Sequence, residues 1–163
     1  MLNQNTLKAY SGTQLTMLVL LRLAIGWHFL YEGIAKLLNP DWSASSYLAN
    51  AVGPMSGMFK AMAANASLLK VINICNEWGL VLIGIGLILG FLTNLSTIAG
   101  ILLLALYYFA QPPLIGVAAP LTAEGSYLFV NKILVELFAM AVLLVFPTGI
   151  RIGIDRFFFR RNN

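Results

Sequence analysis

Long apolar stretches separated by polar segments set the pattern of this chain. A helix that crosses a membrane needs about 20 mainly apolar residues. The stretches long enough are residues 14–38, 71–92, 95–111 and 128–147. No charge lies between Glu77 and Glu124, so the second and third stretches form one apolar hairpin with its turn at Thr93 and Asn94. The pattern predicts an all-α fold, an integral membrane four-helix bundle in a single domain, residues 1–163.

The connections between these helices predict two caps on one side of the bundle. The first connection, 39–70, is long for a bundle, and its segment "VGPMSGMFKAM" mixes glycine, proline and methionine with one lysine. We expect a partly helical outer loop here, part of which lies on the membrane surface as a short amphipathic helix. The third connection, "QPPLIGVAAPLTAEGSY", carries three prolines and predicts an irregular cap.

Composition supports a membrane protein, and charge placement predicts its orientation. The chain is 60% hydrophobic and only 10% charged, with a mean hydropathy of +0.84, whereas a soluble domain is about a quarter charged. The tail "RIGIDRFFFRRNN" has four arginines and one aspartate, and Lys8 lies near the other end. Positive residues favour the cytoplasm. We therefore expect a multi-pass protein of the bacterial inner membrane, with both termini cytoplasmic.

The first apolar stretch contains a row of ionisable side chains. At about 100° per residue, His28, Glu32 and Lys36 lie within about 80° of one another on a helix, and Arg22 falls about 40° beyond Lys36. A charge in the middle of a bilayer costs at least about 2.5–3.5 kcal/mol. Gathered on one stripe, these groups can point into a bundle and find partners instead of facing lipid.

The other three helices bring polar groups to the same outer end, which predicts a polar chamber. Their contributions are Asn73 and Glu77, then Tyr107, Tyr108 and Gln111, then Asn131, Lys132 and Glu136. We expect His28, Glu32 and Glu77 to handle protons, because a lone buried carboxylate would rather take a proton than stay charged. Arg22, Lys36 and the remaining polar groups would bind the ligand.

Each signal also has a plainer interpretation. Lys36 could extend to the outer headgroups, and Lys132 could pair with Glu136 along its own helix. The ladder of Gly79, Gly84, Gly86 and Gly90 is typical of close helix packing. The single Cys75 and single histidine exclude a disulfide, a redox cysteine pair or a bis-histidine haem within one chain. We expect no metal site, and the basic residues are not arranged for nucleic acid.

Several short motifs, in order, resemble the DoxX/DoxD family of small four-helix membrane proteins. They are Arg22, "EGIAK", "EWGLVLIGIGLILGFLTNLS", "NKILVE" and "GIDRF", and they span nearly the whole chain. The long outer connections look closer to the DoxD-like branch. This resemblance implies a membrane subunit of a thiosulfate:quinone oxidoreductase, with quinone as cofactor and a second oxidoreductase subunit or a homodimer as partner. The chain carries "TN" at 93–94, where a basic residue often follows the threonine in the family.

Three functions therefore stand beside one another at this stage. The first is a quinone-linked oxidoreductase subunit, in which the polar chamber binds the quinone and supplies protons. The second is a non-catalytic scaffold for a redox complex, in which the polar groups only specify helix packing. The third is a small proton-coupled transporter, for which intramembrane carboxylates beside a lysine are typical.

Overall fold

The computed structural model describes residues 10–113 and 129–159, and in these ranges it contains helices and no strand. The long helices are α1 (Gly12–Leu37), α4 (Ala66–Leu89), α5 (Thr93–Ala110) and α6 (Lys132–Val145). The short helices are α2 (Ser45–Ala49), α3 (Ser56–Ala64) and α7 (Asp155–Phe159). The all-helical prediction is confirmed, and the expected helical content of the 39–70 connection is present as α2 and α3.

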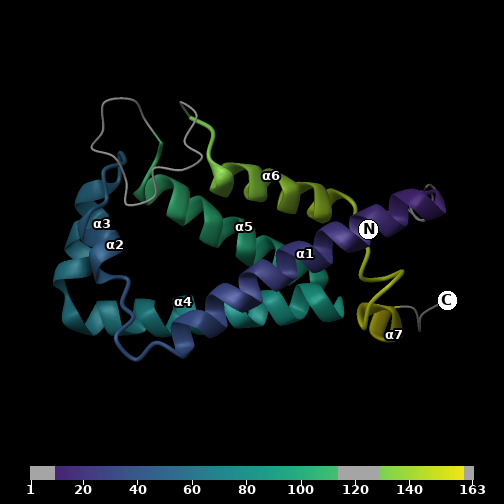
Figure 1. Cartoon of the computed structure of the whole chain (residues 1–163), viewed down its shortest axis with the longest axis horizontal. Helices are drawn as coiled ribbons and strands as arrows, with labels where there is room; N and C mark the ends of the chain where they lie inside the picture. The colour runs from purple at the N-terminus through teal and green to yellow at the C-terminus, as the bar shows by residue number, and fades with distance from the viewer. Residues whose placement is uncertain (1–9, 114–128, 160–163) are drawn as a thin grey trace.

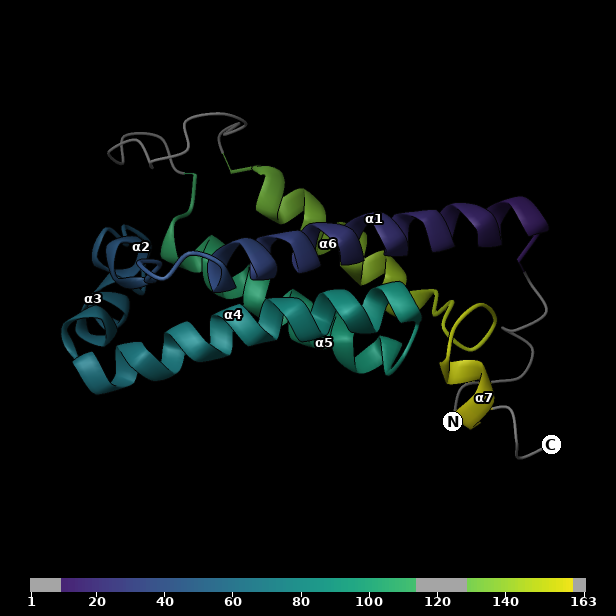
Figure 2. The same ribbon diagram turned by 60° about the horizontal axis from the view of Figure 1, so that its bottom comes forward.

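The four long helices run alongside one another, and the short ones lie at opposite ends (Figure 1). Helix α1 packs along α4, and α5 packs against both α4 and α6. Helices α2 and α3 cap one end, and α7 lies at the other end beside the α4–α5 turn (Figures 1 and 2). The N-terminal part of α1, the α4–α5 turn and the C-terminal segment therefore lie at the same end of the molecule.

Within residues 10–113 and 129–159, three helices are long and apolar enough to cross a membrane: α1, α4 and α5. Helix α6 has 14 residues and a length of about 21 Å, which is less than the roughly 30 Å hydrocarbon core. The predicted stretches 14–38, 71–92 and 95–111 match the first three within a few residues. The fourth crossing, and with it the four-span bundle, stays a prediction, as does the orientation of the termini.

Glycines let α1 and α4 approach closely. A Cβ atom on Gly84 would lie 2.5 Å from the backbone nitrogen of Leu30, and one on Gly33 would lie 2.8 Å from the backbone nitrogen of Val81. The prediction of close packing therefore holds for Gly84. It is wrong for Gly79, where a Cβ would meet nothing within 4 Å, because this glycine faces outward on α4.

The main core is an apolar seam between the long helices, and a second cluster under the cap contains Leu48, Ala51 and Phe59. The outer faces of the helices are apolar as well. Phe29, Leu87 and Met140 are at most 2% exposed and belong to this seam. In contrast, Trp27 and Phe138 are more than 60% exposed, as are other large side chains on α4 and α5. An apolar exterior of this kind suits contact with lipid and would promote aggregation in water.

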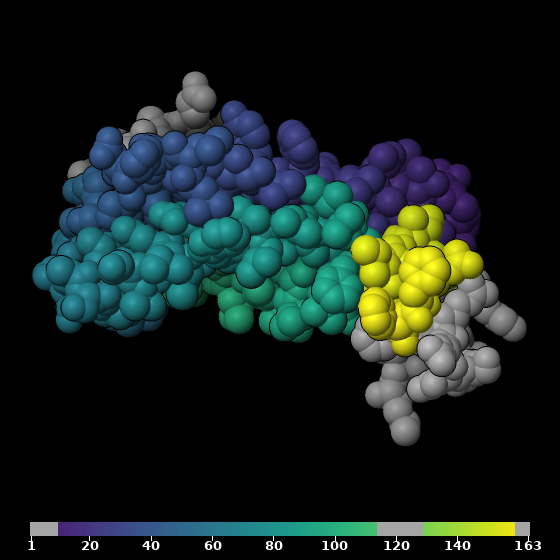
Figure 3. All heavy atoms as spheres, turned by 90° about the horizontal axis from the view of Figure 1, so that it is seen from below, coloured from purple at the N-terminus to yellow at the C-terminus, as the bar shows by residue number. Residues whose placement is uncertain are grey.

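The C-terminal segment docks on the tight turn between α4 and α5. Gly90 ends α4 in the left-handed conformation with φ of 64°, which glycine adopts without steric cost. Its carbonyl accepts the Asp155 N–H at 2.9 Å, and the Leu89 carbonyl accepts the Ile154 N–H at 3.0 Å. Figure 3 shows the resulting position of α7, a small yellow projection beside the ends of α1 and the α4–α5 hairpin.

Candidate functional site

A cavity of about 350 Å³ lies among the four long helices near the α2 end. Its apolar floor is formed by Phe29, Leu80 and Leu104, each at most 4% exposed. Most of the residues predicted to form a polar chamber line it, namely His28, Glu32, Lys36, Tyr107, Gln111, Asn131, Lys132 and Glu136. The sequence therefore anticipated a shared polar space to which α1, α5 and α6 all contribute.

A side-chain hydrogen bond across the cavity joins α1 to α6. His28 Nδ1 lies 2.7 Å from Glu136 Oε1. The Glu136 side chain is only 15% exposed and that of His28 is 52% exposed, so the imidazole reaches in from the more open side. Lys132 was one possible partner for Glu136 in the sequence. The structure instead pairs Glu136 with His28, because α6 turns the carboxylate toward α1.

Lys36 turns into the cavity beneath the cap. Its Nζ donates to Glu32 Oε2 at 3.3 Å and lies 5.4 Å from the centre of the Trp42 ring. The Lys36 side chain is 17% exposed and that of Glu32 is 48% exposed. The lysine is thus held by a carboxylate and an aromatic face, and it presents a cation to the cavity rather than extending to the headgroups.

A buried amide and two tyrosines form the wall on the α4 and α5 side. Asn76 donates through Nδ2 to the Tyr107 hydroxyl at 2.5 Å, while its Oδ1 is buried without a hydrogen-bond partner. The Tyr47 hydroxyl donates to the Tyr107 carbonyl at 2.9 Å. Burial, together with the nearby Tyr107, raises the pKa of Tyr47 well above its ordinary value, so this hydroxyl stays protonated.

The sequence prediction missed Asn76, Tyr47, Trp42 and Ser43, all of which line the cavity. Asn76 carried a detectable signal, because it is an amide inside an apolar helix, three residues after the predicted Asn73. The other three lie in the long connection, where no helical periodicity predicts which way a side chain points. Their position depends on how α2 folds back over the bundle.

Three predicted site residues have other placements near this end. Asn73 holds the cap, since its Oδ1 accepts the Ala44 N–H at 3.0 Å and its Nδ2 donates to Ser43 at 3.2 Å. The Tyr108 hydroxyl donates to the Phe129 carbonyl at 2.7 Å. Glu77 is half-buried and does not line the cavity. The expectation that Glu32 and Glu77 share one chamber is therefore corrected: Asn76 takes the cavity position, and Glu77 is turned about 100° away.

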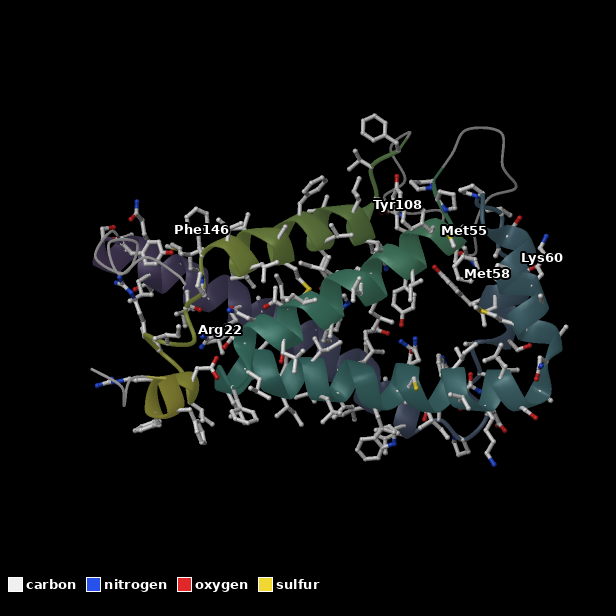
Figure 4. All side chains as sticks on the ribbon, turned by 180° about the vertical axis from the view of Figure 1, so that it is seen from behind. Arg22, Met55, Met58, Lys60, Tyr108 and Phe146 are labelled. Atoms are coloured by element: carbon white, nitrogen blue, oxygen red, sulfur yellow. The ribbon has the colours of Figure 1, made fainter. Side chains whose placement is uncertain are left out.

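Arg22 lies away from the cavity, toward the α7 end of the bundle, so the expectation that it binds the ligand there is corrected. Figure 4 shows Arg22 beside α7, with Tyr108 far from it. Its Nη1 donates to Thr148 Oγ1 at 2.9 Å and its Nη2 to the Ile152 carbonyl at 2.7 Å. Six residues along α1 separate it from His28 by about 9 Å, so a shared stripe did not mean a shared site.

Asp155 completes this second polar centre. Its carboxylate accepts the Leu92 N–H at 2.7 Å, the Thr93 N–H at 2.9 Å and the Thr93 hydroxyl at 2.7 Å. These are free donors at the start of α5, so Asp155 supplies the cap that α5 lacks locally. The "GIDRF" motif therefore ties the C-terminal segment to the hairpin turn.

The fold and the cavity together define a class, a helical membrane protein with a polar chamber under a helical cap. The sequence profile of the DoxX family, described as DoxX, matches residues 17–112. The chain therefore belongs to the DoxX family and is a membrane protein. The matched range runs from α1 through the end of α5, so it includes every wall of the cavity except α6. Neither the curated proteins nor the solved structures contain a match.

Proposed function

We propose that the cavity binds the head group of a membrane quinone, and that this chain is the quinone-reacting membrane subunit of an oxidoreductase, similar to the DoxD-like subunit of thiosulfate:quinone oxidoreductase. The observation that carries the proposal is one cavity of about 350 Å³ with an apolar floor and a polar rim from all four long helices. Cavities of about 300–1,000 Å³ that combine apolar walls with a few placed polar groups are typical of small-molecule sites.

The residues present fit a quinone head group. Phe29, Leu80 and Leu104 offer an apolar surface for a ring, and Lys36 and Gln111 offer donors for its carbonyl oxygens. The buried Oδ1 of Asn76 lacks a donor. A hydroxyl of the reduced ligand would supply it, which would remove the cost of leaving that acceptor unpaired.

The His28–Glu136 pair is suited to deliver protons. Reduction of a quinone to the quinol takes up two electrons and two protons. His28 Nδ1 lies 2.7 Å from Glu136 Oε1, within reach for a proton to pass between the two groups. Glu136, the less exposed member of the pair at 15%, lies on the cavity side and would pass a proton from His28 to the ligand. Lys36 stabilises negative charge that develops on the ligand oxygen.

The electrons must come from a partner of the chain. With one cysteine and one histidine, a single copy cannot hold a metal cluster through thiolate and imidazole ligands. A partner oxidoreductase subunit that oxidises a reduced sulfur anion, such as thiosulfate, fits the DoxD-like interpretation. In this arrangement the chain supplies the quinone site and the proton route.

The test uses the purified full chain in lipid nanodiscs and a short-tailed quinone. We expect saturable quinone binding that weakens at least about tenfold in Lys36→Met, a loss of about 1.4 kcal/mol. Trp27→Phe, on the lipid-facing side of α1, is the matched control and should bind normally. Equal binding by Lys36→Met and the wild type, with both folded, would favour a scaffold role instead.

A further inference from the structure

We infer that the ligand of the cavity enters sideways from the bilayer, through a slot between α1 and α6, and that its alkyl tail leaves the cavity over Ala24, at the inner edge of that slot. The slot is defined by His28 and Glu32 on α1 and by Lys132 and Glu136 on α6. This inference rests on the proposed function, which supplies the head group. It restricts the substrate class to lipid-borne amphiphiles. A water-soluble molecule with the same head group but no tail would be a poor substrate.

The cavity is closed toward the middle of the bundle and toward α4 and α5. Phe29, Leu80 and Leu104 are 2%, 3% and 4% exposed and form a packed floor. Asn76 on the α4 wall is 9% exposed. A ligand therefore cannot pass through these sides without unpacking the core.

The cap holds the outer end shut over α4 and α5. The Tyr47 hydroxyl is bonded to the Tyr107 carbonyl, and Asn73 is bonded to the Ala44 N–H. The Ala110 carbonyl accepts the Val52 N–H at 3.0 Å. These contacts fix the cap to the helix ends from two sides.

The exposed part of the lining lies on α1 and α6. Side-chain exposure is 52% for His28 and 48% for Glu32, and Lys132 is also exposed. Of the neighbouring long helices, α1 and α6 share the least contact, whereas α1 packs extensively on α4 and α6 on α5. The opening therefore lies between these two helices.

The depth of the opening places it against lipid chains. His28 precedes the end of α1 at Leu37 by nine residues, or about 13 Å of helix. With the end of α1 taken at the headgroups of a hydrocarbon core about 30 Å thick, the His28 edge of the slot lies below the headgroups. Ala24, one turn further in on the same edge of α1, is exposed and small, so a tail leaving the cavity would pass over it.

The first experiment maps both parts of a bound ligand on the full chain in nanodiscs. One probe is a quinone with a diazirine on its ring, and the other is a quinone with a diazirine in its decyl tail. We expect ring adducts in the cavity and tail adducts on α1 and α6 beside the slot. Both should fall at least about tenfold with a roughly hundredfold excess of unlabelled decyl quinone, as mass action requires.

The outcomes separate the two proposals. The slot alone would be overturned if the ring adducts lie in the cavity but the tail adducts lie on α2, α3 or the outer faces of α4 and α5. In that case both sets of adducts would still be reduced by the unlabelled decyl quinone. Ring adducts that are absent, or that do not respond to competitor, would overturn the quinone site and this inference with it.

A second experiment blocks the slot. Ala24→Cys is made in a Cys75→Ser background and modified with a small methylthio group or a bulky maleimide. We expect the bulky group to slow ring labelling at least about tenfold relative to the small one, a barrier increase of about 1.4 kcal/mol. Leu82→Cys, exposed on α4, is the matched control and should show no difference. Equal labelling rates with both modifications at position 24 would overturn the slot.

Discussion

At the scale of single residues, the His28–Glu136 contact determines how α1 is held near α6. Removing either partner of this pair lowers the stability of the folded protein, because one member is largely buried and the remaining group is left without its hydrogen bond. We expect His28→Gln and Glu136→Gln each to destabilise the folded protein, and the double variant to lose less than the sum. The coupling should be about 1 kcal/mol in a double-mutant cycle of unfolding in detergent. Additive losses would show that the pair does not form.

Asp155 should matter more for stability than any exposed carboxylate of the chain. It is 4% exposed and accepts three hydrogen bonds at the start of α5. Its replacement by alanine would leave buried donors without partners, so we expect Asp155→Ala to cost about 2 kcal/mol or more. The midpoint of chemical unfolding in detergent measures this. Asp41→Ala, at an exposed position, is the control and should shift the midpoint little.

Helical periodicity predicted the shared face of His28, Glu32 and Lys36 correctly, and it failed for Arg22 and Glu77. A stripe specifies direction around a helix but not which partner lies at each depth. The partners of Arg22 come from Thr148 and Ile152, more than 120 residues away, and no local pattern encodes that contact. Asn76 and Glu77 are adjacent on α4 and point about 100° apart. The sequence therefore placed the wrong one of the two in the cavity.

At the scale of elements, the α1–α4 contact depends on glycines that face the partner helix. A Cβ on Gly84 would meet backbone atoms of Leu30 and Gly26 at 2.5 and 2.8 Å, and backbone cannot move aside as a side chain can. We expect Gly84→Ala to destabilise the protein by about 1–3 kcal/mol. Gly79→Ala, on the same helix with open space around it, should be neutral or stabilising by up to about 1 kcal/mol. Thermal unfolding of both variants checks the contrast, and equal effects would contradict it.

Hydrophobic length alone was sufficient to predict α1, α4 and α5, because few structures other than a spanning helix can hold such apolar runs. It was less informative for α6, whose predicted range 128–147 exceeds the helix Lys132–Val145 at both ends. Asn131 caps this helix through its side chain, and Pro147 follows its end. The Asn131 cap at one margin and Pro147 at the other shorten the helix, although the apolar composition extends further.

At the scale of the whole molecule, the two ends of the bundle differ in what they hold. One end has the cap and the cavity, and the other has the start of α1, the α4–α5 turn and α7 (Figure 2). Because Asp155 bonds directly to Leu92 and Thr93, the chain after α6 lies at the same end as the hairpin turn. If α1, α4 and α5 each cross the bilayer, the path from the end of α5 to α7 must cross it a fourth time.

This path leads to a prediction of topology that the short α6 does not make obvious. The segment after α6 carries Arg151 and Arg156, and positive residues are retained in the cytoplasm. In a Cys75→Ser background, we expect Asn39→Cys to react with a membrane-impermeant maleimide in spheroplasts. Phe157→Cys should react only after permeabilisation, when both variants label equally. Labelling of both before permeabilisation would mean that α6 does not cross, and the reverse pattern would mean that the cavity opens near the cytoplasmic face.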